Sequence, residues 1–282
     1  MSVTGLEIGL CWGTLINAGL PELIEAAARH GFPTLSVRPD SVLKLLQDMS
    51  EATLRRHLRD AGVRVRVIDA LTAGLPGMAE RAETGIRGLG VAPADAATCF
   101  TAAAVECPMV NVAMYGGEPV ATGLLAEAIG GICRDAARSG LEIVLEFIPD
   151  SPMPDIRAAR RIVETCGEAN CRILLDAWHL ARSGGSVADV AALPPGMLGA
   201  FQLDDRSPPE PGAAYVPMTG RKLPGEGQLP LHELTAAALA NNPRITAELE
   251  VFSDELKAMP TAAAAARVAA AVAVWRGGSA QV

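Results

Sequence analysis

The sequence has no uncharged apolar run long enough to cross a bilayer, which takes about 18 residues. The Ala-rich stretch 261–274 comes closest, but Arg267 interrupts it. We therefore expect this stretch to be the last helix of a globular fold, and we expect no membrane partner.

A Cys-x-x-Cys pair is also missing, although the chain has six cysteines. Several of them lie in apolar runs, which is typical of small buried side chains. The N-terminus has no signal-peptide pattern. Together these features predict a cytoplasmic protein with reduced cysteines. The six are Cys11, Cys99, Cys107, Cys133, Cys166 and Cys171.

Positive charge is scarce as well. The chain has 24 Lys and Arg residues against 32 Asp and Glu residues, and a formal net charge of −8. Proteins that bind nucleic acids usually present a basic face. The charge balance therefore argues against a nucleic-acid partner, although it permits a local basic pocket.

What the chain does contain is a regular alternation of strand and helix patterns. Its 282 residues suit one (β/α)₈ TIM barrel, which typically takes about 250. Strands are predicted at 6–11, 34–37, 63–69, 109–114, 142–147, 171–177, 199–204 and 244–252. Helices are predicted at 21–31, 50–62, 93–106, 120–140, 155–167, 186–192, 231–241 and 254–276.

An open doubly wound sheet is the alternative α/β architecture. It would need a Gly-rich turn directly after the first strand, and residues 11–19 lack the G-x-G-x-x-G spacing. No segment has the composition of a linker. We therefore predict a single TIM-barrel domain over residues 1–282.

Four of the predicted strands end in groups that can bind a cation. In a TIM barrel such strand ends meet on one face, so distant residues can share one ion. Carboxylate and amide oxygens suit Mg²⁺ or Mn²⁺. Taken singly, each acidic residue is more often a helix cap, an ion-pair partner or a solvated rim residue. The predicted metal ligands are Glu146, Asp176, Gln202 and Glu250.

Other polar residues lie close to these strand ends. Glu248 and Glu250 are two residues apart and face the same side, and the more C-terminal Glu250 is nearer the catalytic rim. At least one of Asp204 and Asp205 is expected to be structural. Arg221 precedes a Pro-Gly-x-Gly turn and is either an exposed loop residue or a cation held over the barrel mouth.

The blocks LEFIP, LLDAWHLARSGG, FQLDD, RKLPGEGQLPL and LEVFSDEL resemble the xylose isomerase-like TIM barrels, in the family's order. This superfamily includes sugar isomerases, epimerases, and inosose and dehydroshikimate dehydratases. The resemblance covers most of the chain and implies a metal role for Glu146, Asp176, Gln202 and Glu250. It implies a substrate-binding role for His179 and Arg221.

The resemblance also implies chemistry that begins with proton abstraction next to a carbonyl, on a keto-sugar or keto-cyclitol. Glu146, Glu250 and His179 are the predicted acid and base groups. Gln202 stands where the ketose 3-epimerases have His, and residues 147–155 offer only Asp150 and Asp155 where epimerases carry a further Glu. Both departures favour a dehydratase over an epimerase.

Two other functions remain open. One is a metal-dependent phosphodiesterase of the apurinic endonuclease type, a branch that uses many histidines. This chain has four, and His30, His57 and His232 lie on predicted outer helices. The other is a barrel without catalytic activity. The sequence also leaves open whether the protein is a monomer or a homo-oligomer.

Overall fold

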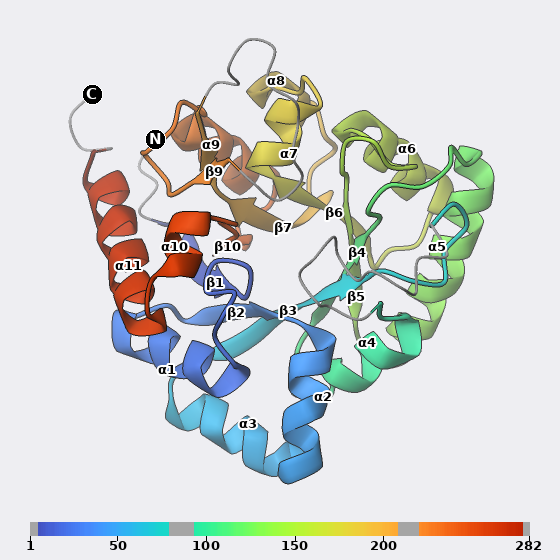
Figure 1. Ribbon diagram of the computed structural model, residues 1–282. Helices are drawn as coiled ribbons and strands as arrows, with labels where there is room; N and C mark the ends of the chain where they lie inside the picture. The colour runs from blue at the N-terminus through green and yellow to red at the C-terminus, as the bar shows by residue number, and fades with distance from the viewer. Residues whose placement is uncertain (1–4, 79–92, 208–219, 279–282) are drawn as a thin grey trace.

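A computed structural model describes residues 5–78, 93–207 and 220–278, and its centre is a closed barrel of eight parallel strands (Figure 1). Around the barrel the strands follow the order β1-β10-β7-β6-β5-β4-β3-β2. The predicted (β/α)₈ TIM barrel is confirmed. The strands are β1 (Glu7–Cys11), β2 (Thr34–Val37), β3 (Arg64–Leu71), β4 (Met109–Ala113), β5 (Glu142–Glu146), β6 (Cys171–Asp176), β7 (Leu198–Leu203) and β10 (Thr246–Leu249).

Helices surround the barrel, as Figure 1 shows. Several begin at a side chain that caps the first turn: Ser50, Asp95 and Asp155 each accept a backbone N–H three residues later. The helices are α1 (Leu20–His30), α2 (Pro39–Asp48), α3 (Glu51–Asp60), α4 (Ala96–Ala103), α5 (Thr122–Ala137), α6 (Ile156–Cys166), α7 (Ala177–Arg182), α8 (Val187–Ala191), α9 (Leu231–Asn241), α10 (Asp254–Ala258) and α11 (Thr261–Gly278).

The strands are apolar on both faces because one face lines the barrel and the other packs against helices. The barrel interior holds a small apolar layer, and the much larger cluster between strands and helices includes Leu145 and Ile173. The interior layer consists of Val67, Met109, Val144, Leu174 and Ala200. This core holds the strand ends in fixed positions, on which the candidate site depends.

Four local features differ from the sequence prediction. Helix α2 follows β2 directly, and α7 begins immediately after β6, where no helix was predicted. The predicted helix 254–276 is two helices, because Pro260 lies between α10 and α11 and its ring lacks an N–H to donate. Strands β8 (Asp205–Arg206) and β9 (Arg221–Lys222) pair antiparallel beside the barrel. Residues 208–219, between β8 and β9, lie outside the described residues.

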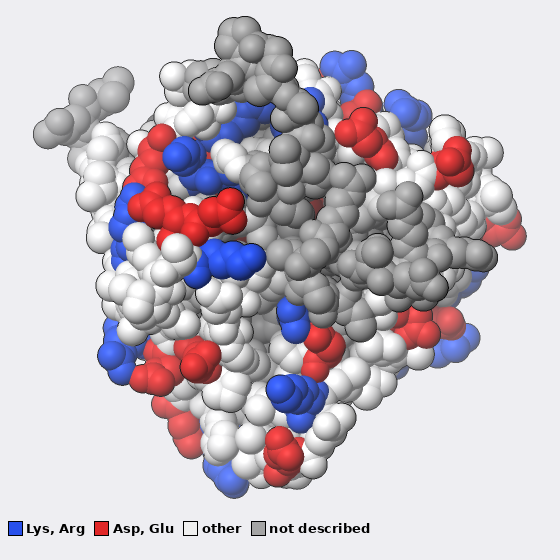
Figure 2. Space-filling model, in the orientation of Figure 1, with Lys and Arg blue, Asp and Glu red and all other residues white. Residues whose placement is uncertain are grey.

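Within the described ranges, no helix has the length and apolar character required to cross a membrane. On the face drawn in Figure 2, acidic and basic side chains are interspersed. The assignment of all 282 residues to one domain stays a prediction, as does the cytoplasmic location.

Candidate active site

The four predicted metal ligands are buried at the C-terminal end of the barrel. Glu146 and Asp176 are the last residues of β5 and β6, Gln202 lies in β7, and Glu250 directly follows β10. In the parallel ladder, Asp176 is paired with Gln202. Each of the four is at most 4% exposed. The folded barrel therefore brings together residues that are up to about 100 positions apart.

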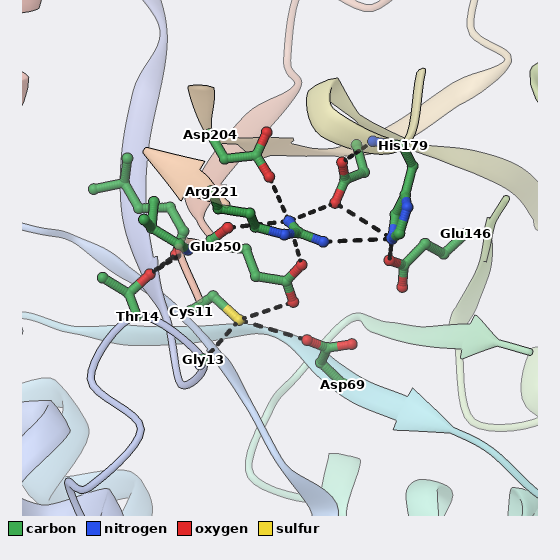
Figure 3. A network of polar contacts seen from close by, with 12 residues as sticks. Cys11, Gly13, Thr14, Asp69, Glu146, His179, Asp204, Arg221 and Glu250 are labelled. Atoms are coloured by element: carbon green, nitrogen blue, oxygen red, sulfur yellow. Dashed lines mark hydrogen bonds and ion pairs between the residues drawn. The ribbon is translucent and has the colours of Figure 1, made fainter. Parts of the chain in front are cut away.

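Arg221 lies at the centre of this group (Figure 3). Its Nη1 is 2.8 Å from Asp176 Oδ2, 2.9 Å from Glu250 Oε2 and 3.0 Å from the Glu250 carbonyl oxygen. It also contacts Asp204 Oδ2. A guanidinium Nη carries two hydrogens, so it cannot donate well to four oxygens at once. Four oxygen atoms therefore surround one cationic group.

The Arg221 guanidinium is also held by aromatic rings. Its Cζ lies 5.1 Å from the ring centroid of Trp178 and 5.4 Å from that of Phe252. Arg221 is 3% exposed, so the alternative of an exposed loop residue is wrong. Strand β9 carries it beneath the surface, whereas its neighbour Lys222 is exposed.

His179 lies in α7, within the same network. The Asp176 carboxylate caps this helix by accepting the His179 backbone N–H at 2.7 Å. The His179 Nε2 is 3.3 Å from Glu146 Oε1 and 3.4 Å from Arg221 Nη2. Burial lowers the pKa of His179 to about 4; Asp176 opposes this shift and Arg221 adds to it. The imidazole is therefore neutral at neutral pH.

Residues in or next to β1, β3 and β4 also contribute to the site, and the sequence prediction missed them. Asp69 Oδ1 accepts from Asn111 Nδ2 at 2.8 Å, and the same amide is 2.7 Å from Glu146 Oε2. Asp69 Oδ2 accepts from Trp12 Nε1 at 3.1 Å. Cys11 Sγ lies 3.4 Å from Glu250 Oε1. Asp69 could have been found by the rule used for the predicted metal ligands, because it is an acidic residue that follows an apolar strand pattern. Asn111 is a polar residue within an otherwise apolar strand.

The site holds more negative than positive charge. Burial raises the pKa of Glu146 well above its usual value, and Asp69 and Asp176 raise it further. Burial likewise raises the pKa values of Asp204 and Glu250, with Arg221 opposing both shifts. Burial by itself would raise the pKa of Asp176, but Arg221 and His179 together lower it by more, so its pKa lies below the usual value. The network therefore needs protons or a second cation for all its carboxylates to coexist.

The donor set fits a divalent cation. Gln202 Oε1 is buried and has no hydrogen-bond partner among the described residues. Glu146, Asp176 and His179 offer ligand atoms within 4.8 Å of one another, and so do Cys11, Asp69 and Glu250. Because excess carboxylate charge and an unpartnered carbonyl oxygen occur together, a cation would satisfy both.

Two neighbouring acidic residues have different surroundings. Asp205 accepts backbone N–H groups from Gly225, Gly227 and Leu229 at 2.9–3.0 Å, so its carboxylate holds the Pro-Gly-x-Gly turn in place. Glu248 lies deeper in the barrel, where Thr34 and Thr246 donate to its Oε1 at 3.2 Å each. Burial raises the pKa of Glu248 to about 7, although Arg66 lowers it.

The chain belongs to the family of xylose isomerase-like TIM barrels, whose pattern it matches over residues 24–276. It is 28% identical over 229 residues to a Streptomyces coelicolor protein named "Putative hydroxypyruvate isomerase", covering 74% of this chain and 77% of that one. Its fold is similar to that of the IolI protein with a bound zinc atom, with a TM-score of 0.79, 16% identity and coverage of 97% and 99%. It is also similar to D-psicose 3-epimerase in the presence of D-fructose, with a TM-score of 0.68, 17% identity and coverage of 96% and 98%.

Proposed function

We propose that the protein is a divalent-metal-dependent isomerase, epimerase or dehydratase of a keto-sugar or keto-cyclitol. The observation that carries this proposal is the cluster of buried carboxylates around Arg221 at the C-terminal end of the barrel. Active sites of TIM barrels form at this end. The family of the chain and the names of its relatives support the same class of chemistry.

Glu146, Asp176, Gln202 and Glu250 are the residues proposed to hold the metal, with Mg²⁺ or Mn²⁺ favoured by their oxygen donors. When bound, such an ion polarises the substrate carbonyl and stabilises the negative charge that develops as the neighbouring proton leaves. The zinc atom of the IolI protein supports a cation in this kind of barrel.

Glu146 and Glu250 are proposed to move the proton. A general base works best when its pKa lies near the operating pH, and the raised pKa values of both carboxyls bring them closer to neutrality. Neutral His179 would exchange a proton with a departing or migrating hydroxyl through Nε2, which faces Glu146. Arg221 is proposed to bind substrate oxygens, since its guanidinium lies among the catalytic groups.

The product is decided after the proton has left the substrate. Return of a proton to the other face or to the neighbouring carbon gives an epimer or isomer, whereas departure of a β-hydroxyl gives an enone and water. Gln202 in place of a histidine favours elimination in this proposal.

Deuterium exchange tests the proposal. The metal-reconstituted protein is incubated in deuterium oxide with a panel of keto-sugars and keto-cyclitols, and NMR follows the carbon next to the carbonyl. We expect solvent deuterium at that carbon or an enone product, and loss of both after chelation. Cleavage of an abasic DNA duplex, without exchange or turnover of the panel, would instead identify an endonuclease. A protein that binds no metal and turns over none of these substrates would be a non-catalytic barrel.

A further inference from the structure

Three cysteines meet at the end of β6 opposite to the candidate active site. Cys133 lies in α5, Cys166 is the last residue of α6, and Cys171 is the first residue of β6. Their sulfur atoms all lie within 4.8 Å of one another. Cys133 and Cys171 are buried and Cys166 is half-buried, so the cluster can be reached through Cys166.

The cluster is separate from the carboxylate site. Cys171 and Asp176 are the two ends of β6, which places them about 16 Å apart at ~3.3 Å per residue. Asp176 belongs to the C-terminal face of the barrel and Cys171 to the N-terminal face. The three thiols therefore take no part in the reaction proposed above.

The spacing of the sulfurs suits a single ion. In the tetrahedral coordination typical of Zn²⁺, two sulfurs that each lie about 2.3 Å from the ion are ~3.8 Å apart. The three sulfurs already lie within 4.8 Å of one another, so binding requires them to approach by at most ~1 Å. Sulfur ligands select thiophilic cations over Mg²⁺ and Mn²⁺.

A hydrogen bond holds the backbone around the cluster in place. Asn170 Nδ2 donates to the Cys133 carbonyl at 2.8 Å, which ties the connection between α6 and β6 to α5. This hydrogen bond thus helps to hold α5, α6 and β6 together around the three sulfur atoms.

We propose that Cys133, Cys166 and Cys171 form a binding site for a thiophilic metal ion, Zn²⁺ or another d¹⁰ cation. Each thiol that binds the ion releases its proton to water as the metal–sulfur bond forms. Water completes the coordination of Zn²⁺ on the half-buried side at Cys166. The bound ion joins α5, α6 and β6 and so stabilises this end of the barrel.

Cadmium titration tests this site, because cadmium–thiolate bonds give an ultraviolet charge-transfer band that carboxylate ligands do not give. The reduced full chain is titrated with Cd²⁺ alone. Cys166→Ala removes one ligand at the least buried position of the cluster. Cys11→Ala is the matched control, because Cys11 contacts Glu250 and could contribute a thiolate at the carboxylate site. Circular dichroism checks that each variant is folded.

We expect one equivalent of Cd²⁺ to produce the band in the wild-type protein and in Cys11→Ala, and the band to be lost in Cys166→Ala. A large excess of Zn²⁺ should compete with Cd²⁺ and weaken the band, and a rise in pH should strengthen binding. Absence of the band from the folded wild type overturns the proposal. An undiminished band with unchanged affinity in Cys166→Ala, or loss of the band in Cys11→Ala, also overturns it, because Cys166 would then not bind the ion or Cys11 would supply the thiolate.

Discussion

Arg221 is the residue on which the electrostatics of the candidate site depend. It contacts Asp176, Asp204 and Glu250, which are all buried. Removing one partner of a buried ion pair costs about 3–5 kcal/mol because the other charge is left uncompensated. In the metal-free protein, Arg221→Gln should therefore lower the free energy of unfolding by several kcal/mol.

The same substitution should make the protein respond more strongly to a metal. A divalent cation can then compensate carboxylates that Arg221 no longer contacts, so Mn²⁺ should raise the melting temperature of Arg221→Gln more than that of the wild type. Lys222→Gln, an exposed change on the same strand, is the control. Equal metal-free melting temperatures for the two variants would contradict this account of Arg221.

His179 provides a test of proton transfer. If Nε2 exchanges a proton with substrate, His179→Asn should lower kcat by about 10²–10⁴, the usual contribution of a general acid or base. Asn preserves the backbone N–H that Asp176 accepts, so helix α7 should remain capped. Steady-state kinetics and metal analysis on the same sample check this, and an unchanged kcat would assign His179 a structural role.

Glu248 gives a pH-dependent prediction. Its pKa in the folded protein is about 7, above the ordinary 4.5, so the folded state binds the proton more tightly than the unfolded state. The resulting stabilisation is complete below about pH 4.5 and is lost as the pH rises through 7. Glu248→Gln cannot ionise, and its amide oxygen can still accept from Thr34 and Thr246.

Glu248→Gln should therefore be more stable than the wild type at pH 8, by about 2–4 kcal/mol if a shift of ~2.5 pH units is fully expressed. The two proteins should differ little at pH 4.5. Thermal melts across this range measure the difference. Glu233→Gln, the same change at an exposed position of α9, should show no pH-dependent difference in stability from the wild type. If it shows the same difference, the ionisation of Glu248 is not the cause.

At the scale of elements, the short β8–β9 pair and the turn after it position Arg221. Asp205 accepts three backbone N–H groups from this turn, and bonds to a charged acceptor contribute about 1.5–3 kcal/mol each at most. Asp205→Ala should loosen the turn and raise KM, because Arg221 is no longer held among the catalytic groups. Glu226→Ala, which removes a surface partner of Arg267, is the control. Equal KM values in both variants would contradict this positioning role.

The eight barrel strands could be predicted from the sequence because each is a short, largely apolar run that alternates with a helix pattern. Helix α2 was missed because β2 leads into it through Arg38-Pro39, which resembles a loop. The last helix was predicted as one because Pro260 is a single interruption in an Ala-rich pattern. Local patterns thus identify elements well and their interruptions poorly.

The candidate site was predictable only where its residues lie at the ends of apolar strand patterns. This holds for the four predicted metal ligands, which lie together at the C-terminal end of the barrel although their roles stay predictions. They are Glu146, Asp176, Gln202 and Glu250. The burial of Arg221 could not be foreseen, because it results from the pairing of β9 with β8 across residues 208–219. Non-local pairing of this kind leaves no periodic signal in the sequence.

For the molecule as a whole, metal binding should couple to stability. A ligand that binds only the folded state stabilises it by about 2.7 kcal/mol at 100 times its Kd. For a chain of this size each kcal/mol raises the melting temperature by roughly 2–4 °C. Saturating Mn²⁺ should thus raise the wild-type melting temperature by roughly 5–10 °C, and chelation should reverse this. Asp176→Asn should abolish the response while the barrel stays folded, since Asn can still cap α7. A melting temperature that is the same with chelator and with Mn²⁺ would count against a cation among these carboxylates, whatever the activity of the sample.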